Sequence, residues 1–318
     1  MNETDRILPV SPYLRSAVWG GQRLKALYPT DLERPAEAWI FSLLPDHPST
    51  LPDGTPLPDA LRAAGVPEAE IAAFPLVKRI DAERDLSVQV HPDDDYARAH
   101  GSPCGKNEWW YVTHAGPEAR IAWGITSREA LRAAMDRGDP APALRSLSVR
   151  SGQHFLIPAG MVHALGAGVE VLEVQQPSDV TYRLWDYGRL DADGRPRELH
   201  VRQALDVARA YEPCEIEALR YARTEGVVPR PTAELSGSVA LCLCAAPWFR
   251  VVHLSVTGEA RLASADELRC LAILDGAGTL AASSGREFPV RAGDTFALLP
   301  DGGPLSLSGC LSAALIRR

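Results

Sequence analysis

The chain has 318 residues, of which 46% are hydrophobic and 23% are charged. This balance is typical of a folded globular protein and excludes the disordered, collagen-like and coiled-coil classes, and the length predicts two domains or one large one. Because 33 Lys and Arg stand against 41 Asp and Glu, the net charge of -8 disfavours nucleic acid or an anionic membrane as partner, although a small anion can bind locally.

The N-terminus and the cysteines indicate the compartment. Residues 1–21 lack an apolar run of signal-peptide length, and nowhere do 18 apolar residues follow one another. We therefore expect a cytoplasmic protein without a membrane partner, either a monomer or a homodimer. The six cysteines are scattered, so free thiols are expected. For the pair Cys242 and Cys244, core packing is favoured over metal ligation because no matching Cys or His pair follows nearby.

Short segments rich in Val, Ile, Leu, Phe and Trp, separated by Gly and Pro, predict a mainly β fold, either a sandwich or a barrel. Before residue 212 the expected strands are 38–44, 74–80, 86–90, 108–113, 120–123, 154–157 and 169–175. A broken helix is expected over 58–73. Ser127 caps a predicted helix that ends before Gly138, and a second short helix follows over 141–147. A last helix covers 201–209.

Beyond about residue 212 the composition changes, since His253 is the only histidine there and Leu, Ala, Gly and Ser dominate. Turns are expected at 275–276 and 301–303. The expected strands are 250–256, 269–274, 278–282, 295–299 and 311–316. We therefore predict a first domain over 1–211, with a small helical insertion at about 126–148, and a second β domain over 212–318.

A polar face interrupts the apolar strand around residue 88. In an extended chain Ser87, Gln89 and His91 point to one side, while the valines between them point to the other. Polar groups inside a barrel need partners, because an unpaired buried polar group costs about 1–3 kcal/mol. A metal ion or a sugar would satisfy them, and a solvent-exposed sheet face is the alternative.

A second element is the turn over 158–160, which ends one strand and returns His163 toward the barrel interior. Its spacing resembles the second sequence motif of cupins, which bind metal inside a small β-barrel. With Gln89, His91 and Glu108, His163 forms a Gln/His/Glu/His set that suits Zn²⁺ or another divalent transition metal and leaves room for substrate oxygens. We interpret the remaining histidines as surface residues or as hydrogen-bonded core residues; they are His47, His100, His114, His154, His200 and His253.

Five sequence blocks carry a wider resemblance. They are FPLVK at 74–78, LSVQVHPDD at 86–94, GKNEWWY at 105–111, IPAGMVHA at 157–164 and LEVQQPSDVTYRLWDY at 172–187. In order and spacing over about residues 12–210 they resemble type I mannose-6-phosphate isomerases in their short bacterial form. The resemblance implies a catalytic cupin domain, which is a jelly-roll β-barrel, with one divalent metal ion, usually zinc. It also implies interconversion of D-mannose 6-phosphate and D-fructose 6-phosphate through an enediol.

The resemblance further implies roles for individual residues. Metal ligation falls on Gln89, His91, Glu108 and His163, and the phosphate-site serine and lysine fall on Ser87 and Lys106. The proposed catalytic arginine corresponds to Arg183, and the substrate-site carboxylates to Glu173 and Asp179.

Two questions about these residues stay open. The proton carrier can be Glu173, Asp179, Lys106 or a metal-bound water, because distances and pKa values decide it. Arg183 has an alternative role as an ion-pair partner of Asp186, which the spacing permits.

The chain also departs from the family pattern. Asn107 stands where Thr or Pro is usual, Trp109 where Cys is common, and Pro177 where Ser is frequent. These changes concern the fit of the substrate more than the chemistry, because none removes a proposed ligand. Residues 212–318 match only loosely: 291–300 looks like a cupin strand and turn, but no histidine follows it. The expected second domain is a degenerate cupin-like barrel without metal.

Two other functions are compatible with the sequence. One is an isomerase of another aldose or aldose phosphate on the same scaffold, which the sequence does not discriminate. The other is a non-catalytic cupin that binds a sugar or a metal. Arg183 disfavours the second, since a binding module has no need of an arginine beside a metal.

Overall fold

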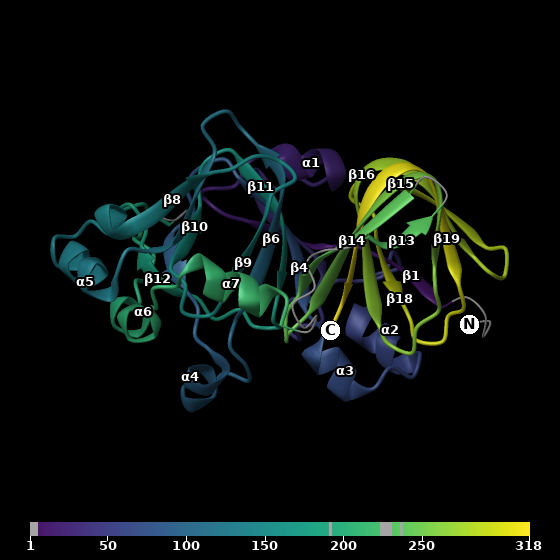
Figure 1. Ribbon diagram of the computed structural model, residues 1–318, viewed down its shortest axis with the longest axis horizontal. Helices are drawn as coiled ribbons and strands as arrows, with labels where there is room; N and C mark the ends of the chain where they lie inside the picture. Colours follow the sequence, from purple (N-terminus) through teal and green to yellow (C-terminus); the bar gives the residue numbers. More distant parts are fainter. Residues whose placement is uncertain (1–5, 191–192, 223–230, 236–237) are drawn as a thin grey trace. The chain divides into compact units, whose positions relative to one another are not determined.

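The computed structural model describes residues 6–190, 193–222, 231–235 and 238–318 (Figure 1). It is mainly β, which confirms the predicted fold class. Short helices connect the strands: α1 (Arg23–Leu27), α2 (Leu57–Ala63), α3 (Glu68–Ala73), α4 (Asp94–Ala99), α5 (Arg128–Asp136), α6 (Val201–Val207) and α7 (Pro213–Arg220). Within the described residues no helix is both long and apolar enough to span a bilayer.

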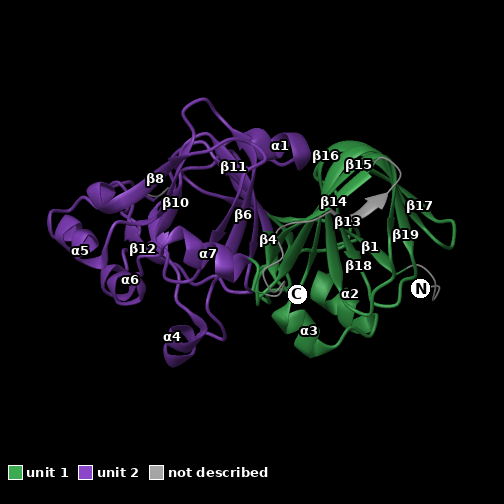
Figure 2. Cartoon of the chain, viewed as in Figure 1, with its two compact units in different colours: residues 1–13, 39–77, 221–318 green, residues 14–38, 78–220 purple. Residues whose placement is uncertain are grey.

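The chain divides into two compact units (Figure 2). One unit comprises residues 14–38 and 78–220, and it contains every residue that the sequence predicts for the site. The other comprises 1–13, 39–77 and 221–318. The boundary expected between residues 211 and 212 stays a prediction.

Two sheets frame unit 2 of Figure 2, which contains the predicted site residues. The six-stranded sheet runs in the order β2 (Tyr13–Ser16), β3 (Pro35–Phe41), β4 (Leu76–Ala82), β11 (Val169–Gln175), β6 (Glu108–Ala115) and β9 (His154–Ile157). The five-stranded sheet runs in the order β12 (Tyr182–Trp185), β5 (Val88–Val90), β10 (His163–Leu165), β7 (Arg120–Ile125) and β8 (Leu144–Ser148).

The alternation along β5 decides which side chains face the interior between the sheets. Val88 and Val90 are buried in an apolar cluster with Leu131 of α5 and Ala204 of α6, so these helices cover the outer face of the five-stranded sheet. Because successive side chains of a strand point to opposite faces, Gln89 points inward. The polar face predicted for this strand therefore lines the interior.

Unit 1 of Figure 2 carries an eight-stranded sheet with a core of its own. The main path is β1 (Ile7–Val10), β18 (Thr295–Leu298), β16 (Arg269–Ala282), β19 (Leu305–Arg317), β15 (Arg250–Leu262), β14 (Ser238–Ala245) and β13 (Pro231–Leu235), and β17 (Glu287–Arg291) pairs with β16. Its buried cluster is apolar, with Leu254, Leu271, Phe296 and Leu307 among its members. All six cysteines are free, and Cys242 is buried, as expected.

Two expectations about local structure are wrong. The second short helix expected over 141–147 is a single 3₁₀ turn, η1 (Ala141–Ala143), followed by β8, which pairs with β7. Tertiary pairing thus overrides a local helical period, and helix in the insertion is confined to α5 and this turn. The turn expected at 275–276 is a bulge inside the continuous strand β16, where the register shifts after Ile273 and Gly276 takes φ +78°.

Candidate active site

Strand pairing brings three site residues side by side. β5 lies between β10 and β12, and Gln89 is paired in register with His163 on one side and Arg183 on the other. Glu108 begins β6 of the opposite sheet. His91 directly follows β5. Ligand-type side chains from both sheets therefore converge between them.

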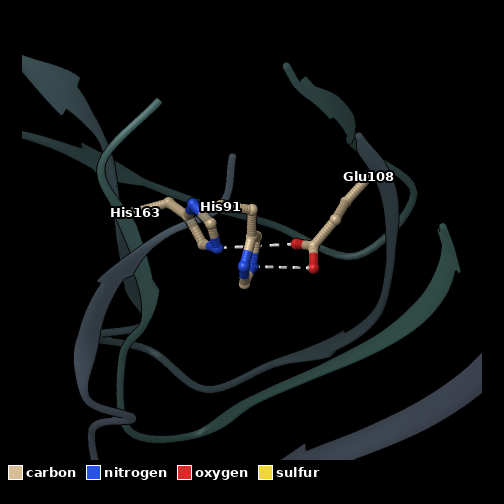
Figure 3. Close-up of side chains that lie close together, drawn as sticks. All are labelled: His91, Glu108 and His163. Carbon is tan, nitrogen blue, oxygen red and sulfur yellow. Dashed lines mark ion pairs between the residues drawn. The ribbon is translucent and has the colours of Figure 1, made fainter. Parts of the chain in front are cut away.

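His91, Glu108 and His163 form the only group of three or more His, Cys, Asp or Glu residues within the described chain that could hold a metal ion (Figure 3). His91 Nε2 lies 3.1 Å from Glu108 Oε1, and His163 Nε2 lies 3.5 Å from Glu108 Oε2. All three side chains are fully buried. Gln89 Nε2 lies 3.3 Å from His163 Nε2, so the fourth predicted ligand borders the same space.

Hydrogen bonds behind the two imidazoles define which nitrogen is available. His91 Nδ1 lies 2.8 Å from the carbonyl of Val180, and His163 Nδ1 lies 2.8 Å from that of Met161. A carbonyl oxygen only accepts, so each Nδ1 carries the proton and each Nε2 presents a lone pair. Both lone pairs are directed toward Glu108. Acceptors that face one another in this way are stabilised by a positive charge close to them.

The protonation states match those of metal ligands. Burial, and next the positive charge of Lys106, lower the pKa of His91 to about 3, and burial lowers the pKa of His163. Burial by itself would raise the pKa of Glu108, but the positive charge of Lys106 holds it well below its ordinary value. Neither Glu108 oxygen has a well-aligned hydrogen bond from the described residues. Two neutral imidazoles and an ionised carboxylate therefore fit a divalent metal.

Lys106 contributes the positive charge nearest to these ligands. Its Nζ lies 2.8 Å from Glu108 Oε1 and 3.4 Å from His91 Nε2. Burial by itself would lower its pKa, yet Glu108 and Glu173 raise it, so the buried amine stays charged.

Glu173 lies in a second buried charge cluster. Its Oε2 accepts a hydrogen bond from Trp110 Nε1 at 2.9 Å, and its Oε1 lies 3.4 Å from Lys78 Nζ. Lys78 Nζ also lies 3.8 Å from Glu37 Oε2. Burial, and then the negative charge of Glu108, raise the pKa of Glu173 to about 7. This carboxyl therefore can exchange a proton near neutral pH.

Arg183 is half-buried on β12. Its Nη1 donates to the carbonyl of Glu198 at 2.7 Å, while its Nε is buried without a partner among the described residues. Asp186, the alternative ion-pair partner, is paired with Arg189 and Arg197 instead. The position of Arg183 is therefore not explained by an ion pair with Asp186.

The last two predicted residues lie apart from these contacts. Ser87 is buried, whereas Asp179 is exposed. Among the described residues, neither forms a hydrogen bond or an ion pair with the metal-ligand candidates. Sequence reasoning gives no role to Lys78 or Gln176. The signal that could have found Lys78 is its rarity, since it is one of only three lysines and stands in an apolar strand.

Two curated proteins are similar to the chain over most of its length. The chain is 33% identical to the mannose-6-phosphate isomerase ManA of Bacillus subtilis over 310 residues, which cover 94% of each protein. It is 32% identical to the mannose-6-phosphate isomerase of Streptococcus mutans over 299 residues, or 88% of each. No family model matches the chain.

Solved structures show the same relationship. The crystal structure of mannose 6-phosphate isomerase from B. subtilis matches 99% of this chain and 100% of its own, with a TM-score of 0.85 and 27% identity. The Salmonella typhimurium enzyme bound to its substrate and to zinc shares the fold, with a TM-score of 0.71 at 14% identity and coverage of 98% and 99%. By sequence and by fold, the chain belongs to the family of mannose-6-phosphate isomerases.

Proposed function

We propose that the protein is a zinc-dependent isomerase that interconverts D-mannose 6-phosphate and D-fructose 6-phosphate through an enediol. One observation carries the proposal: two neutral imidazoles direct their lone pairs at an ionised carboxylate in a fully buried site. Membership of the family supplies the substrate. An acidic protein attracts such an anion through local positive charge, and Lys106 is a candidate for it.

Gln89, His91, Glu108 and His163 would hold the ion, and zinc bound there supplies a Lewis acid for the oxygens of the sugar. The carbonyls of Val180 and Met161 keep the two imidazoles in the ligating tautomer. The amide of Gln89 can turn its oxygen or its nitrogen toward the site, since both orientations fit one side-chain shape.

The reaction moves a proton between two adjacent carbons, so it needs a group that gains and loses a proton near neutral pH. Glu173 meets this requirement best among the candidates, because its pKa is raised to about 7. Trp110 Nε1 fixes one carboxyl oxygen, and Lys78 lies near the other. The exposed Asp179 stays a prediction as a substrate-site carboxylate.

Charge develops on the sugar oxygens in the enediolate. Arg183 cannot lose its proton in a protein, and its planar fork suits the stabilisation of an anion. Lys106 stands beside the metal-ligand candidates Glu108 and His91, which supports contact with the reacting oxygens more than with the phosphate at the far end of the sugar. Ser87 stays a prediction for the phosphate.

An assay of the purified, zinc-loaded protein tests the proposal. We expect turnover of mannose 6-phosphate, and little or none of free mannose or of other aldose phosphates. Turnover of another aldose instead would indicate a different isomerase, and zinc binding without any turnover would indicate a binding module. Lys106→Ala distinguishes its two roles: a loss confined to phosphorylated sugars supports phosphate binding, and an equal loss for all sugars supports contact with the reacting end.

Removal of one ligand tests the metal assignment. We expect His163→Ala to lose both bound zinc and activity while the apolar core stays folded, and His100→Ala, which changes an exposed histidine, to keep both. Elemental analysis that finds one equivalent of zinc in His163→Ala would refute the ligand set.

A further inference from the structure

A chain of side-chain hydrogen bonds joins the segments that carry the three ligands. It begins at Asn107, directly before Glu108. Asn107 Oδ1 accepts from the backbone N–H of Ala159 at 2.7 Å, and Ala159 belongs to the turn that leads to His163. Asn107 Nδ2 donates to Gln176 Oε1 at 2.6 Å. The Asn107 side chain thus fixes the start of β6 to the turn before β10.

Gln176 extends the chain to the third segment. Its Oε1 also accepts from the backbone N–H of Asn107 at 3.1 Å, and its Nε2 donates to Asp94 Oδ1 at 3.1 Å. The same Asp94 oxygen accepts from the backbone N–H of Gly105 at 2.8 Å. Asp94 follows His91 by three residues. We call the side chains of Asn107 and Gln176 the amide bridge, because together they reach all three ligand-bearing segments.

The donors and acceptors allow one orientation for each amide. The Ala159 N–H only donates, so Asn107 must turn its oxygen toward Ala159 and its nitrogen toward Gln176. Gln176 Oε1 receives two N–H groups, so its nitrogen faces the carboxylate of Asp94. Both side chains are buried, with 4% and 7% of their surface exposed. Each side-chain oxygen and nitrogen of the amide bridge has at least one hydrogen-bond partner, and a buried network of this kind fixes one geometry.

The ligands depend on their backbone for direction. The carboxylate of Glu108 is contacted at 2.8 Å by Lys106, two residues before it in the same segment, so the position of that segment sets where the carboxylate lies. His163 bonds through Nδ1 to the carbonyl of Met161, in the turn that contains Ala159. Displacement of that turn would therefore displace the imidazole together with its acceptor.

We propose that Asn107 and Gln176 are positioning residues that set the metal affinity of the site, an inference that rests on the proposed function for the identity of the metal. Among the described residues, neither amide bonds to a ligand side chain. They act by holding three backbone segments at the separation that lets one ion reach His91, Glu108 and His163. Partners behind metal ligands commonly change metal affinity by about 10- to 100-fold when they are removed.

Zinc affinity, measured by competition with a chromogenic chelator, tests this proposal in the full chain. Asn107→Leu keeps a similar volume and removes both side-chain bonds, and we expect zinc binding to weaken about 10- to 100-fold. Gln176→Leu should act in the same direction. The double variant should lose less than the product of the two single losses, because the two side chains share a bond.

Thr113→Val is the matched control. Thr113 lies on β6 as well, but its Oγ1 donates at 2.9 Å to Glu170 Oε1 of β11, so its loss lowers stability without breaking a bond between two ligand-bearing segments. The midpoint temperature of thermal unfolding of the metal-free proteins should fall in the control and in the variants. Zinc affinity should fall in the variants alone. Zinc affinity of Asn107→Leu within twofold of wild type would overturn the proposal.

A milder variant keeps the test decisive if Asn107→Leu does not fold. Asp94→Ala removes only the partly exposed end of the network, and we expect about tenfold weaker zinc binding. Unchanged affinity in a folded Asp94→Ala would count against the amide bridge. These measurements need no sugar, so a wild-type protein that binds zinc but does not isomerise mannose 6-phosphate would refute the proposed function alone.

Discussion

At Glu108 and Lys106, burial and charge act against each other. Burial opposes the ionised form of both, yet each raises the stability of the other's charge, so the pKa of the carboxyl falls and that of the amine rises. Removal of one partner from such a buried pair typically costs about 3–5 kcal/mol, because the other charge is left uncompensated. The folded chain therefore holds Glu108 in its ligating form before any ion binds.

The raised pKa of Glu173 gives a pH dependence of stability opposite in sign to that of a carboxylate whose pKa is lowered on folding. Its folded pKa of about 7 lies above its ordinary value of 4.5, so the folded state binds more protons than the unfolded state between these values. Stability from this group is complete below pH 4.5 and is lost as the pH rises through 7. We expect the free energy of unfolding of the metal-free protein to fall by about 3 kcal/mol over that range from this group.

Glu173→Gln should remove this component, since the amide does not titrate. Chemical denaturation of the metal-free wild type and variant at several pH values measures the difference between them. A difference that stays constant from pH 4.5 to 7 would contradict the raised pKa.

Arg183 is predicted to act on the transition state rather than on binding. If it stabilises the enediolate, Arg183→Ala should lower kcat about 100-fold with a smaller change in KM, and Arg183→Lys should restore only part of the rate. Zinc content should stay at one equivalent in both variants. A large loss of stability with unchanged kcat would instead assign Arg183 a structural role through its bond to Glu198.

Some of the site was predictable from single residues, and some was not. Alternation around Gln89 and the turn before His163 fix which way these side chains face, and both are local patterns. The bond from Asn107 to Gln176 joins residues 69 apart, and no periodicity in the sequence marks it. Contacts of that kind depend on strand register, which the sequence does not display.

At the scale of elements, α5 shows a local rule that holds. Ser127 Oγ accepts from the backbone N–H of Ala130 at 3.0 Å, and Leu131 and Ala134 are buried, so cap and apolar spacing agree with the predicted helix. Ser127→Ala should cost about 1 kcal/mol of local stability, because a free N–H is left at the helix start. Ser127→Asp retains an acceptor and should cost little.

Amide hydrogen exchange within α5 measures this effect directly. Exchange at Leu131 should accelerate in Ser127→Ala and stay close to wild type in Ser127→Asp, while zinc binding is unchanged in both. Equal protection in the two variants would show that packing of the apolar face, rather than the cap, stabilises the helix.

The two wrong predictions of local structure have the same cause. β8 and the middle of β16 are defined by their partners: β8 by its pairing with β7, and the bulge near Gly276 by its pairing with β19. Asp-Gly is a frequent turn pair, but the same glycine freedom also suits a bulge. The helix–strand choice over 141–147 and the turn–bulge choice at 275–276 therefore needed tertiary information.

At the scale of the whole molecule, the two compact units have different chemical content. Unit 2 of Figure 2 contains the metal-ligand candidates and their charged neighbours between two sheets. Unit 1 has an apolar core, and the described residues of this unit include no group of three or more His, Cys, Asp or Glu that could hold an ion. That the expected second β domain holds no metal, and where its boundary lies, both stay predictions.

The separation of the ligands along the chain determines when an ion can be captured. Gln89 and His163 are 74 residues apart, and they meet only when β5 pairs with β10. Gln89, His91 and Glu108 are close in the sequence, but His163 joins them only after this long loop has closed, so the complete ligand set is expected to form in a chain that has already folded. Added zinc should therefore leave the refolding rate nearly unchanged and slow unfolding, which stopped-flow fluorescence can measure. Refolding that accelerates with zinc would mean that the metal helps to nucleate the fold. We expect instead that the ion stabilises a barrel whose strands have already paired and has no part in directing their assembly.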